Sequence, residues 1–234
     1  MNKCMKAFSF VVAVCLSEFL MAEELPPPCD PVLVKKPVKI VRREIKVSII
    51  GADRPQGPAD VSRATAENCF AYWKKWMDGE IANKLDLVVL PEGVLSYKGY
   101  GTDKKLVVVR NCGDRLLKMF QVYAKEHACY LSFNAYRQRP DGRFANTSFF
   151  LDREGDVIGV YDKVYPTPGE IEWKEFPIVP GEGPVVVETG FYGVRPHLGG
   201  RGPGTNDTVK RYSRGGFVMS DSSVRRLRVR LHVG

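Results

Sequence analysis

Histidine and closely spaced cysteines are scarce in this sequence, and their scarcity argues against a metal site. The 234 residues include three histidines, and none of the six cysteines belongs to a CxxC pair. Structural zinc sites need closely spaced cysteine and histidine ligands, so we expect no metal. The sequence also lacks an internal repeat, a collagen-like or coiled-coil period and a nucleic-acid-binding motif. Its composition, 44% apolar and 26% charged, is that of an ordinary globular protein.

Long apolar runs are confined to the N-terminus. Lys3 and Lys6 precede the apolar run AFSFVVAVCLSEFL at residues 7–20. This order predicts a signal peptide over residues 1–22 and a secreted or periplasmic protein. Lipid attachment at Cys15 is a weaker alternative. The run is too short to serve as a permanent membrane span.

The cysteines are too far apart in sequence to define one pairing. Loss of residues 1–22 would leave four thiols, which allow three disulfide pairings in an oxidising compartment. Buried free thiols are the interpretation that we favour. The six cysteines are Cys4, Cys15, Cys29, Cys69, Cys112 and Cys129, and none occurs between residues 130 and 234.

Two segments differ from the rest in composition. Residues 23–43 contain five prolines, which disfavour a helix and predict a linker or extended arm. Most of the net charge of +8 lies in residues 191–234, with eight arginines, one lysine and two aspartates. Low apolar content with charge of one sign predicts a disordered tail over residues 194–234. A second interpretation of this tail is a frameshifted, non-native reading frame, and a third is a polyanion-binding segment.

Hydrophobic periodicity predicts strands and helices in alternation, followed by hairpin strands. Ala66, Phe70, Trp73, Met77 and Ile81 form one face of a helix that runs to about residue 85, with Asp60 as its cap. A second helix carries Leu116, Phe120, Tyr123 and His127 on its buried face. The predicted strands are residues 46–50, 87–90, 130–135, 146–151 and 157–161. This order indicates an α/β fold with a mixed sheet.

Charged residues follow two of these strands. In DLVVLPEGV, Glu92 comes directly after a strand that is apolar on both faces, and Lys163 follows the strand at residues 157–161. Open α/β folds place their chemistry at such strand ends. A carboxylate there can act as a general base, and a lysine can stabilise an oxyanion. Taken singly, a loop-capping glutamate and a surface lysine are the better explanations of the two positions.

Together, two motifs resemble the carbon–nitrogen hydrolase (nitrilase) superfamily over residues 44–193. They are LPEGVLSYKGY, from residue 90, and NTSFFLDREGDVIGVYDKVYPTPGE, from residue 146. The resemblance implies an α-β-β-α sandwich that hydrolyses small amides, nitriles or carbamoyl compounds with a Glu-Lys-Cys triad and without metal or cofactor. It implies that Glu92 is the general base, that Lys163 stabilises the tetrahedral intermediate, and that Glu170 is an additional positioning glutamate.

The sequence departs from the family pattern where the cysteine is expected. The family places it after a segment like GPVVVETGFYG, which occurs here at residues 183–193, but VRPHLGGRG follows without a cysteine. The resemblance therefore predicts a sandwich that is incomplete at its C-terminus and a hydrolase that is inactive as written. The alternatives are a secreted pseudoenzyme that holds an amide-like ligand and a binding module with a basic, polyanion-binding tail. A homo-oligomer is left open.

Overall fold

The computed structural model describes residues 31, 33, 45–81, 84–183, 185–187, 189, 194–198, 217–221 and 227–233. The signal peptide predicted at residues 1–22 lies outside these ranges, as do most of the predicted linker and most of the predicted tail. The helices are η1 (Val61–Arg63), α1 (Ala66–Ile81), α2 (Thr102–Glu126) and α3 (Pro168–Ile171). The strands are β1 (Ile45–Gly51), β2 (Leu87–Val89), β3 (Tyr130–Gln138), β4 (Phe144–Leu151), β5 (Val157–Asp162), β6 (Val185–Val186), β7 (Val194–Leu198), β8 (Phe217–Asp221) and β9 (Leu227–Val233).

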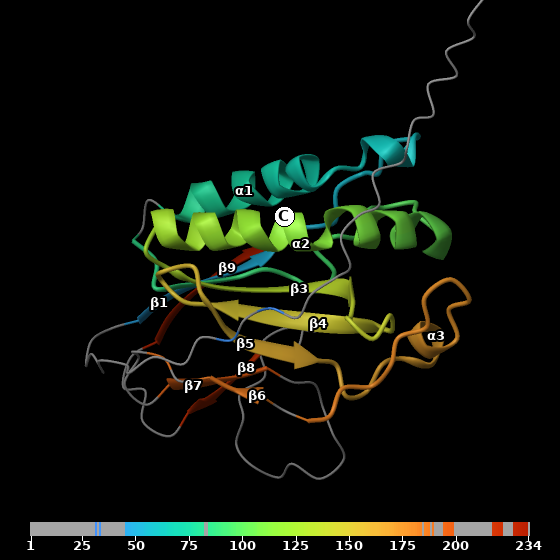
Figure 1. The fold of residues 1–234 in the computed structure, drawn as a ribbon. Coiled ribbons are helices and arrows are strands. Elements are labelled where there is room, and N and C mark those ends of the chain that lie inside the picture. Colours follow the sequence, from blue (N-terminus) through green and yellow to red (C-terminus); the bar gives the residue numbers. More distant parts are fainter. Residues whose placement is uncertain are drawn as a thin grey trace, which may run out of the picture.

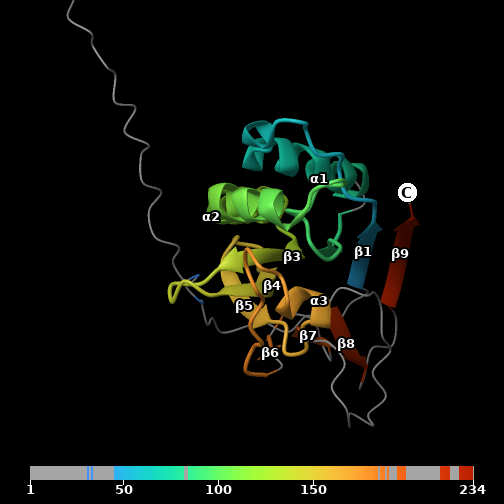
Figure 2. The same cartoon turned by 90° about the vertical axis from the view of Figure 1, so that its right-hand side faces the viewer.

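The described elements form a mixed α/β fold in three layers. A six-stranded sheet of order β5-β4-β3-β2-β1-β9 lies between the helices α1 and α2 and a small sheet of order β6-β7-β8 (Figures 1 and 2). Strands β9, β1, β2 and β3 are parallel, whereas β4 and β5 continue the sheet as antiparallel hairpins. The α/β fold with a mixed sheet that the sequence predicted is therefore confirmed.

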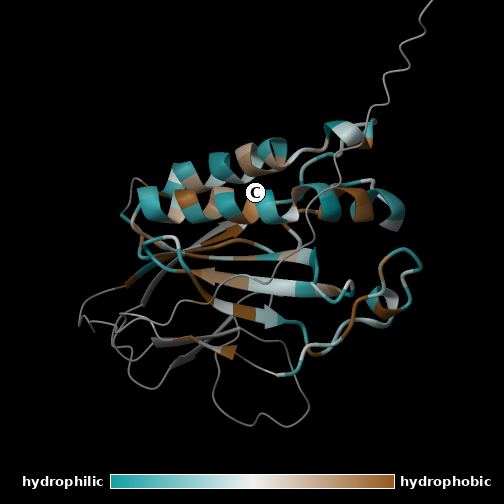
Figure 3. Cartoon of the chain, viewed as in Figure 1, coloured by the Kyte–Doolittle hydropathy of each residue, from teal (hydrophilic) through white to brown (hydrophobic). Residues whose placement is uncertain are grey.

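Burial on both faces of β2 explains its continuous apolar run. Val88 packs with Trp73 and Phe120 from the helices in one core cluster, whereas Leu87 and Val89 pack on the opposite face. Both α1 and α2 alternate between hydrophilic and hydrophobic residues along their length (Figure 3), as expected of helices that cover a sheet with one face. In the described part of the chain, no helix combines the length and apolarity needed to cross a membrane.

The start and the end of the first long helix were predicted wrongly. Asp60 caps the short helix η1, where its side chain accepts a hydrogen bond from the N–H of Ser62. Thr65 caps α1 instead, because its Oγ1 accepts from the N–H of Asn68 at 3.2 Å. The helix ends at Ile81, before the predicted residue 85. Its fully buried stripe also differs from the predicted one and consists of Ala66, Cys69, Trp73, Met77 and Glu80.

Three strands lie within the segment that was predicted to be a tail. The backbone of β9 pairs in parallel with β1 from Ile45–Leu227 to Gly51–Val233, and β7 pairs with β6 and β8. The other residues of the segment 194–234 lie outside the described ranges. Disorder in the rest of this segment stays a prediction. Its origin in another reading frame also stays a prediction, which the nucleotide sequence around codons 185–234 can decide.

Candidate functional site

Glu92 lies in the loop that follows β2, and hydrogen bonds fix this loop against β3. The N–H of Val94 donates to the carbonyl oxygen of Asn134 at 2.9 Å, and the N–H of Gly93 donates to Oδ1 of Asn134 at 2.9 Å. Gly93 has a φ of +75°, which glycine adopts without steric cost. The carbonyl oxygen of Val94 accepts from Nε1 of the buried Trp73 at 2.8 Å. The helix layer and β3 thus hold the backbone on both sides of Glu92.

Lys163 directly follows β5 and continues its pairing with β4. Its N–H donates to the carbonyl oxygen of Asn146 at 2.8 Å, and its own carbonyl oxygen accepts from the N–H of Gly181 at 3.1 Å. A Cβ at position 181 would lie 2.1 Å from the carbonyl oxygen of Asp162. Glycine is therefore needed for this segment to approach the end of β5.

Glu170 belongs to the short helix α3, and the start of this helix fixes its carboxylate. Oγ1 of Thr167 accepts from the N–H of Glu170 at 3.3 Å, while Oε2 of Glu170 accepts from the N–H of Thr167 at 2.7 Å. This reciprocal capping box satisfies two backbone donors. Glu170 is only 5% exposed, so its charge has to be compensated by neighbouring groups.

These three side chains converge on one point. Nζ of Lys163 lies 3.1 Å from Oε1 of Glu92 and 3.0 Å from Oε2 of Glu170. The side chains of Glu92 and Lys163 are 27% and 23% exposed, whereas that of Glu170 is 6% exposed. The structure therefore brings together all three residues that the sequence singled out, and solvent reaches Lys163 and Glu92. Their catalytic roles stay predictions.

Two asparagines and a tyrosine complete the cluster, and sequence reasoning had given none of them a role in it. Nδ2 of Asn146 donates to Oε1 of Glu92 at 2.8 Å and to Oε1 of Glu170 at 2.7 Å. Asn134 donates to Oδ1 of Asn146 at 2.6 Å, and the hydroxyl of Tyr136 donates to Oε1 of Glu170 at 3.2 Å. Asn146 is 1% exposed, which also makes it unsuitable as a glycosylation acceptor in the folded protein. The available signal was Asn134, a polar residue between Phe133 and Ala135 in a predicted strand.

The charges of the cluster stabilise one another. Burial disfavours the ammonium of Lys163, but hydrogen bonds to Glu170 and the charge of Glu92 outweigh burial and raise the pKa of Lys163. Burial likewise disfavours the carboxylate of Glu170. Hydrogen bonds from the N–H of Thr167, from Asn146 and from Lys163 outweigh it and lower the pKa of Glu170. At neutral pH the cluster therefore contains a charged lysine and a charged Glu170.

The lowered pKa of Glu170 predicts a specific loss of stability in acid. A carboxyl group with a depressed pKa stabilises the fold above its ordinary pKa of 4.5, and this contribution is lost as the pH falls through the folded-state value. We expect Glu170→Gln to be about 1–3 kcal/mol less stable than the parent at pH 7, as for loss of a charged hydrogen bond. The deficit should shrink as the pH falls from about 5 to 3.

Urea unfolding at several pH values measures this effect, and Glu172→Gln provides the matched control because Glu172 is exposed at the end of the same helix. A deficit of Glu170→Gln that stays constant between pH 7 and pH 3 would show that the carboxylate is not held ionised by its neighbours.

The cysteines of the described region are poor candidates for the nucleophile. Cys69, Cys112 and Cys129 are free and buried, as the sequence predicted. Burial raises the pKa of Cys69 to about 12 and those of Cys112 and Cys129 to about 11. A thiol attacks as a thiolate, so these three sulfur atoms are inert at neutral pH. Within the described ranges, no group of three or more histidine, cysteine or acidic side chains is placed to hold a metal ion.

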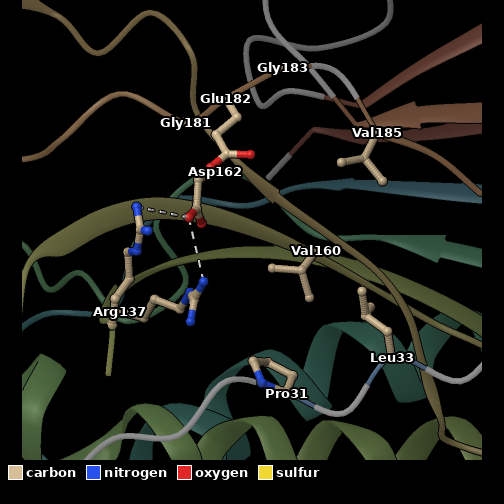
Figure 4. A pocket seen from close by; sticks show the side chains of 10 residues that line it. Pro31, Leu33, Arg137, Val160, Asp162, Gly181, Glu182, Gly183 and Val185 are labelled. Carbon is tan, nitrogen blue, oxygen red and sulfur yellow. Dashed lines mark hydrogen bonds and ion pairs between the residues drawn. The ribbon is translucent and has the colours of Figure 1, made fainter. Parts of the chain in front are cut away.

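A cavity of about 370 Å³ lies away from this cluster. It has a polar wall around Arg137 and Asp162, whose Nη2 and Oδ2 atoms are 3.4 Å apart, and an apolar wall that includes Leu33 and Val160 (Figure 4). Asp162 and Lys163 are consecutive, and consecutive residues of extended chain point to opposite sides. The cavity is lined by Pro31, Leu33, Arg137, Arg139, Val160, Asp162, Gly181, Glu182, Gly183 and Val185. Because Glu92, Lys163 and Glu170 do not line it, it is not the candidate site.

Among known proteins, only solved structures resemble this chain. No family model and no curated protein matches the sequence. An amidase from Nesterenkonia sp. is 19% identical, with a TM-score of 0.46 over 62% of this chain and 51% of the amidase. A carbon-nitrogen hydrolase from Helicobacter pylori is 20% identical, with a TM-score of 0.45 over 58% of this chain and 46% of that protein. The C. elegans NitFhit protein is 18% identical, with a TM-score of 0.47 over 62% of this chain and 34% of that protein.

This chain thus spans about half the length, or less, of the solved proteins that it resembles.

Proposed function

We propose that Glu92, Lys163 and Glu170 form the base-and-cation half of a site for small amides or nitriles, of the kind that hydrolyses carbon–nitrogen bonds. The observation that carries this proposal is the position of the Lys163 ammonium, within 3.1 Å of two carboxylates from separate segments. Ion pairs that only stabilise a fold also have short distances. The exposure of Glu92 and Lys163 in one place, above a buried Glu170, favours a site that meets a ligand.

We propose a different role for each side chain. Lys163 keeps its proton, so its ammonium can donate to an oxygen or nitrogen that gains negative charge when the carbon is attacked. Glu92 is the more exposed carboxylate and can accept the proton of an attacking nucleophile. Glu170 is held by Thr167 and Asn146, so it positions Lys163 and does not transfer protons itself.

The nucleophile is the missing part of this mechanism. Residues 130–234 contain no cysteine, and the three thiols of the described region are buried with raised pKa values. We propose that residues 1–234 bind an amide at this site without hydrolysing it. Binding without turnover is the behaviour expected of a pseudoenzyme.

Ammonia release and ligand binding together test this function. We expect no ammonia from propionamide or propionitrile above the rate in buffer, because no activated thiol attacks the substrate. We expect propionamide to bind, as measured by saturation-transfer NMR, and Glu92→Gln to weaken binding about tenfold through loss of a charged acceptor. Glu172→Gln is the control for a change of charge at an exposed position.

Two results would contradict the proposal. Ammonia release that stops after thiol alkylation would show that a cysteine of this chain acts as a nucleophile. Unchanged propionamide affinity in Glu92→Gln would show that the amide does not bind at the cluster. Three further expectations are independent of this experiment and stay predictions: secretion by residues 1–22, a homo-oligomer, and polyanion binding by the basic segment 194–234.

A further inference from the structure

The cavity beside β5 contains an arginine whose side chain makes no hydrogen bond within the described part of the chain. Arg139 directly follows β3 and lines the cavity. Its guanidinium has ion-pair contacts of 3.4 Å with Oδ2 of Asp141 and 3.9 Å with Oδ2 of Asp162, which are too long for good charged hydrogen bonds. The side chain is only 24% exposed, so water replaces these hydrogen bonds only in part. An acceptor in the cavity would satisfy the unused N–H donors.

Other arginines already bind the two carboxylates nearest to Arg139. Nε of Arg143 donates to Oδ2 of Asp141 at 2.8 Å, and Nη2 of Arg143 lies 2.6 Å from the same oxygen. Nη2 of Arg137 donates to Oδ2 of Asp162 at 3.4 Å. Three arginines therefore share two carboxylates, and Arg139 has the longest contacts of the three. A carboxylate that entered the cavity would pair with Arg139 without breaking a shorter ion pair.

The other wall of the cavity is apolar. It includes Leu33, Val160 and Val185, and Figure 4 shows these three side chains on the side of the cavity away from Arg137 and Asp162. Leu33 is 52% exposed, so it presents apolar surface to solvent. A carbon chain that covers this wall would remove apolar surface from water, which favours its binding.

The acidic residues of the cavity limit the charge of an anion that binds there. Asp162 and the exposed Glu182 line it together with Arg137 and Arg139. The formal charges of the lining therefore balance, and an anion beside Arg139 also lies in a cavity that contains two carboxylates. One negative charge can pair with Arg139, whereas a second would be repelled by Asp162 and Glu182. A monoanion with an apolar remainder fits this lining better than a phosphate or a dicarboxylate.

We propose that this cavity binds a small aliphatic monocarboxylate, with its carboxylate at Arg139 and its carbon chain against Leu33, Val160 and Val185. Arginine binds a carboxylate through two parallel N–H donors. The volume of about 370 Å³ lies within the range of small-molecule sites and has room for an acid of about five carbon atoms. The inference is independent of the proposed function, because Glu92, Lys163 and Glu170 do not line this cavity.

Four probes test the two ends of this ligand separately on the unsubstituted protein. We expect calorimetry at low ionic strength to give 3-methylbutanoate an affinity at least about tenfold higher than that of acetate, which lacks three carbon atoms of the chain. The affinity should also be at least about tenfold higher than that of 3-methylbutan-1-ol, which lacks the charge. Inorganic phosphate, which has no carbon chain, should bind more weakly than 3-methylbutanoate.

A substitution and methyl NMR locate the bound acid. Arg139→Gln should reduce the affinity for 3-methylbutanoate about tenfold and leave that for 3-methylbutan-1-ol within about twofold of the parent value. Arg115→Gln is the control for a lost positive charge, because Arg115 is 71% exposed on α2 and does not line the cavity. With labelled valine methyl groups, 3-methylbutanoate should shift the signals of Val160 and Val185. The signals of Val94, which lies in the loop of Glu92, should not change.

Each alternative outcome would overturn one part of this inference. Equal affinity for 3-methylbutanoate and acetate, or tighter binding of phosphate, would show an anion site without a role for the apolar wall. Unchanged affinity in Arg139→Gln would show that another group binds the carboxylate. Shifts at Val94 without shifts at Val160 and Val185 would place the acid at the Glu92–Lys163–Glu170 cluster and leave the cavity without a ligand. None of these results affects the proposed function, which propionamide binding tests separately.

Discussion

Substitution of Lys163 by methionine should lower the free energy of unfolding by about 3 kcal/mol at pH 7. Methionine keeps much of the length of lysine and removes its charge. Glu170, which is 5% exposed, and Glu92 would then lack the ammonium that both carboxylates share. Removal of one partner of a buried ion pair costs about 3–5 kcal/mol, whereas exposed pairs contribute about 0–1 kcal/mol. The partial exposure of Lys163 places the expected value at the lower end of the first range. Urea unfolding measures it.

Two further variants show whether the loss comes from the cluster. Lys74→Met breaks the exposed pair of Lys74 with Asp78 on α1 and should cost about 0.5 kcal/mol or less. The double variant Lys163→Met/Glu170→Gln should recover part of the loss, because a neutral amide needs no cation. If Lys163→Met is no less stable than Lys74→Met, the ammonium does not compensate the buried carboxylate and the cluster is not a coupled unit.

The sheet was the most predictable part of this fold. The run at β2, 3 residues long, is apolar on both faces, and the run at β3, 9 residues long, begins with alternating apolar and polar residues. Both strand assignments follow from local sequence. The dipeptide Asp141-Gly142 favours a hairpin turn between β3 and β4, and Gly142 has a φ of +81°. The parallel pairing of β9 with β1 joins residues far apart in sequence, and local patterns do not contain that information.

The helices were less predictable at their ends. The second helix begins at Thr102, although hydrophobic periodicity indicated only the part around residues 116–127. Its first half contains the β-branched Val107, Val108 and Val109 and the helix-disfavouring Gly113, which reduce the local preference for a helix. Burial of Val108 and Val109 against the core compensates for this low propensity. Tertiary packing therefore stabilises the first half of α2, which the local sequence does not favour.

Glu92 and Lys163 were predictable because each follows a predicted strand, whereas Glu170 was singled out only by the resemblance of its motif to the carbon–nitrogen hydrolase family. Their separation along the chain did not matter, since the ends of β2 and β5 are brought together by β3 and β4, which lie between these strands in the sheet. Asn146 was not given a role because it lies within a predicted strand, where polar residues commonly occur on one face. Only the structure shows that its amide contacts both glutamates.

Asn146→Asp should be the most damaging single-atom change in the cluster, with a cost that increases with pH. It replaces the NH₂ that donates to Glu92 and Glu170 by an oxygen, at a position that is 1% exposed. Burial and two neighbouring carboxylates favour the protonated form of the new aspartic acid. In the unfolded chain the same group ionises near pH 3.9. A group that stays protonated in the fold therefore costs up to about 1.4 kcal/mol for each pH unit above this value.

This charge-dependent cost is at most about 4 kcal/mol at pH 7 and about 1.5 kcal/mol at pH 5. Asn146→Leu provides the reference, because it also removes the two hydrogen bonds but introduces no titrating group. Urea unfolding of both variants at the two pH values should give a difference between them that is larger at pH 7 by up to about 3 kcal/mol. A difference that does not change with pH would mean that the new carboxylate ionises in the folded state. The two glutamates would then be too weakly coupled to Asn146 to hold Lys163 in a defined position, and the proposed site would lose its physical basis.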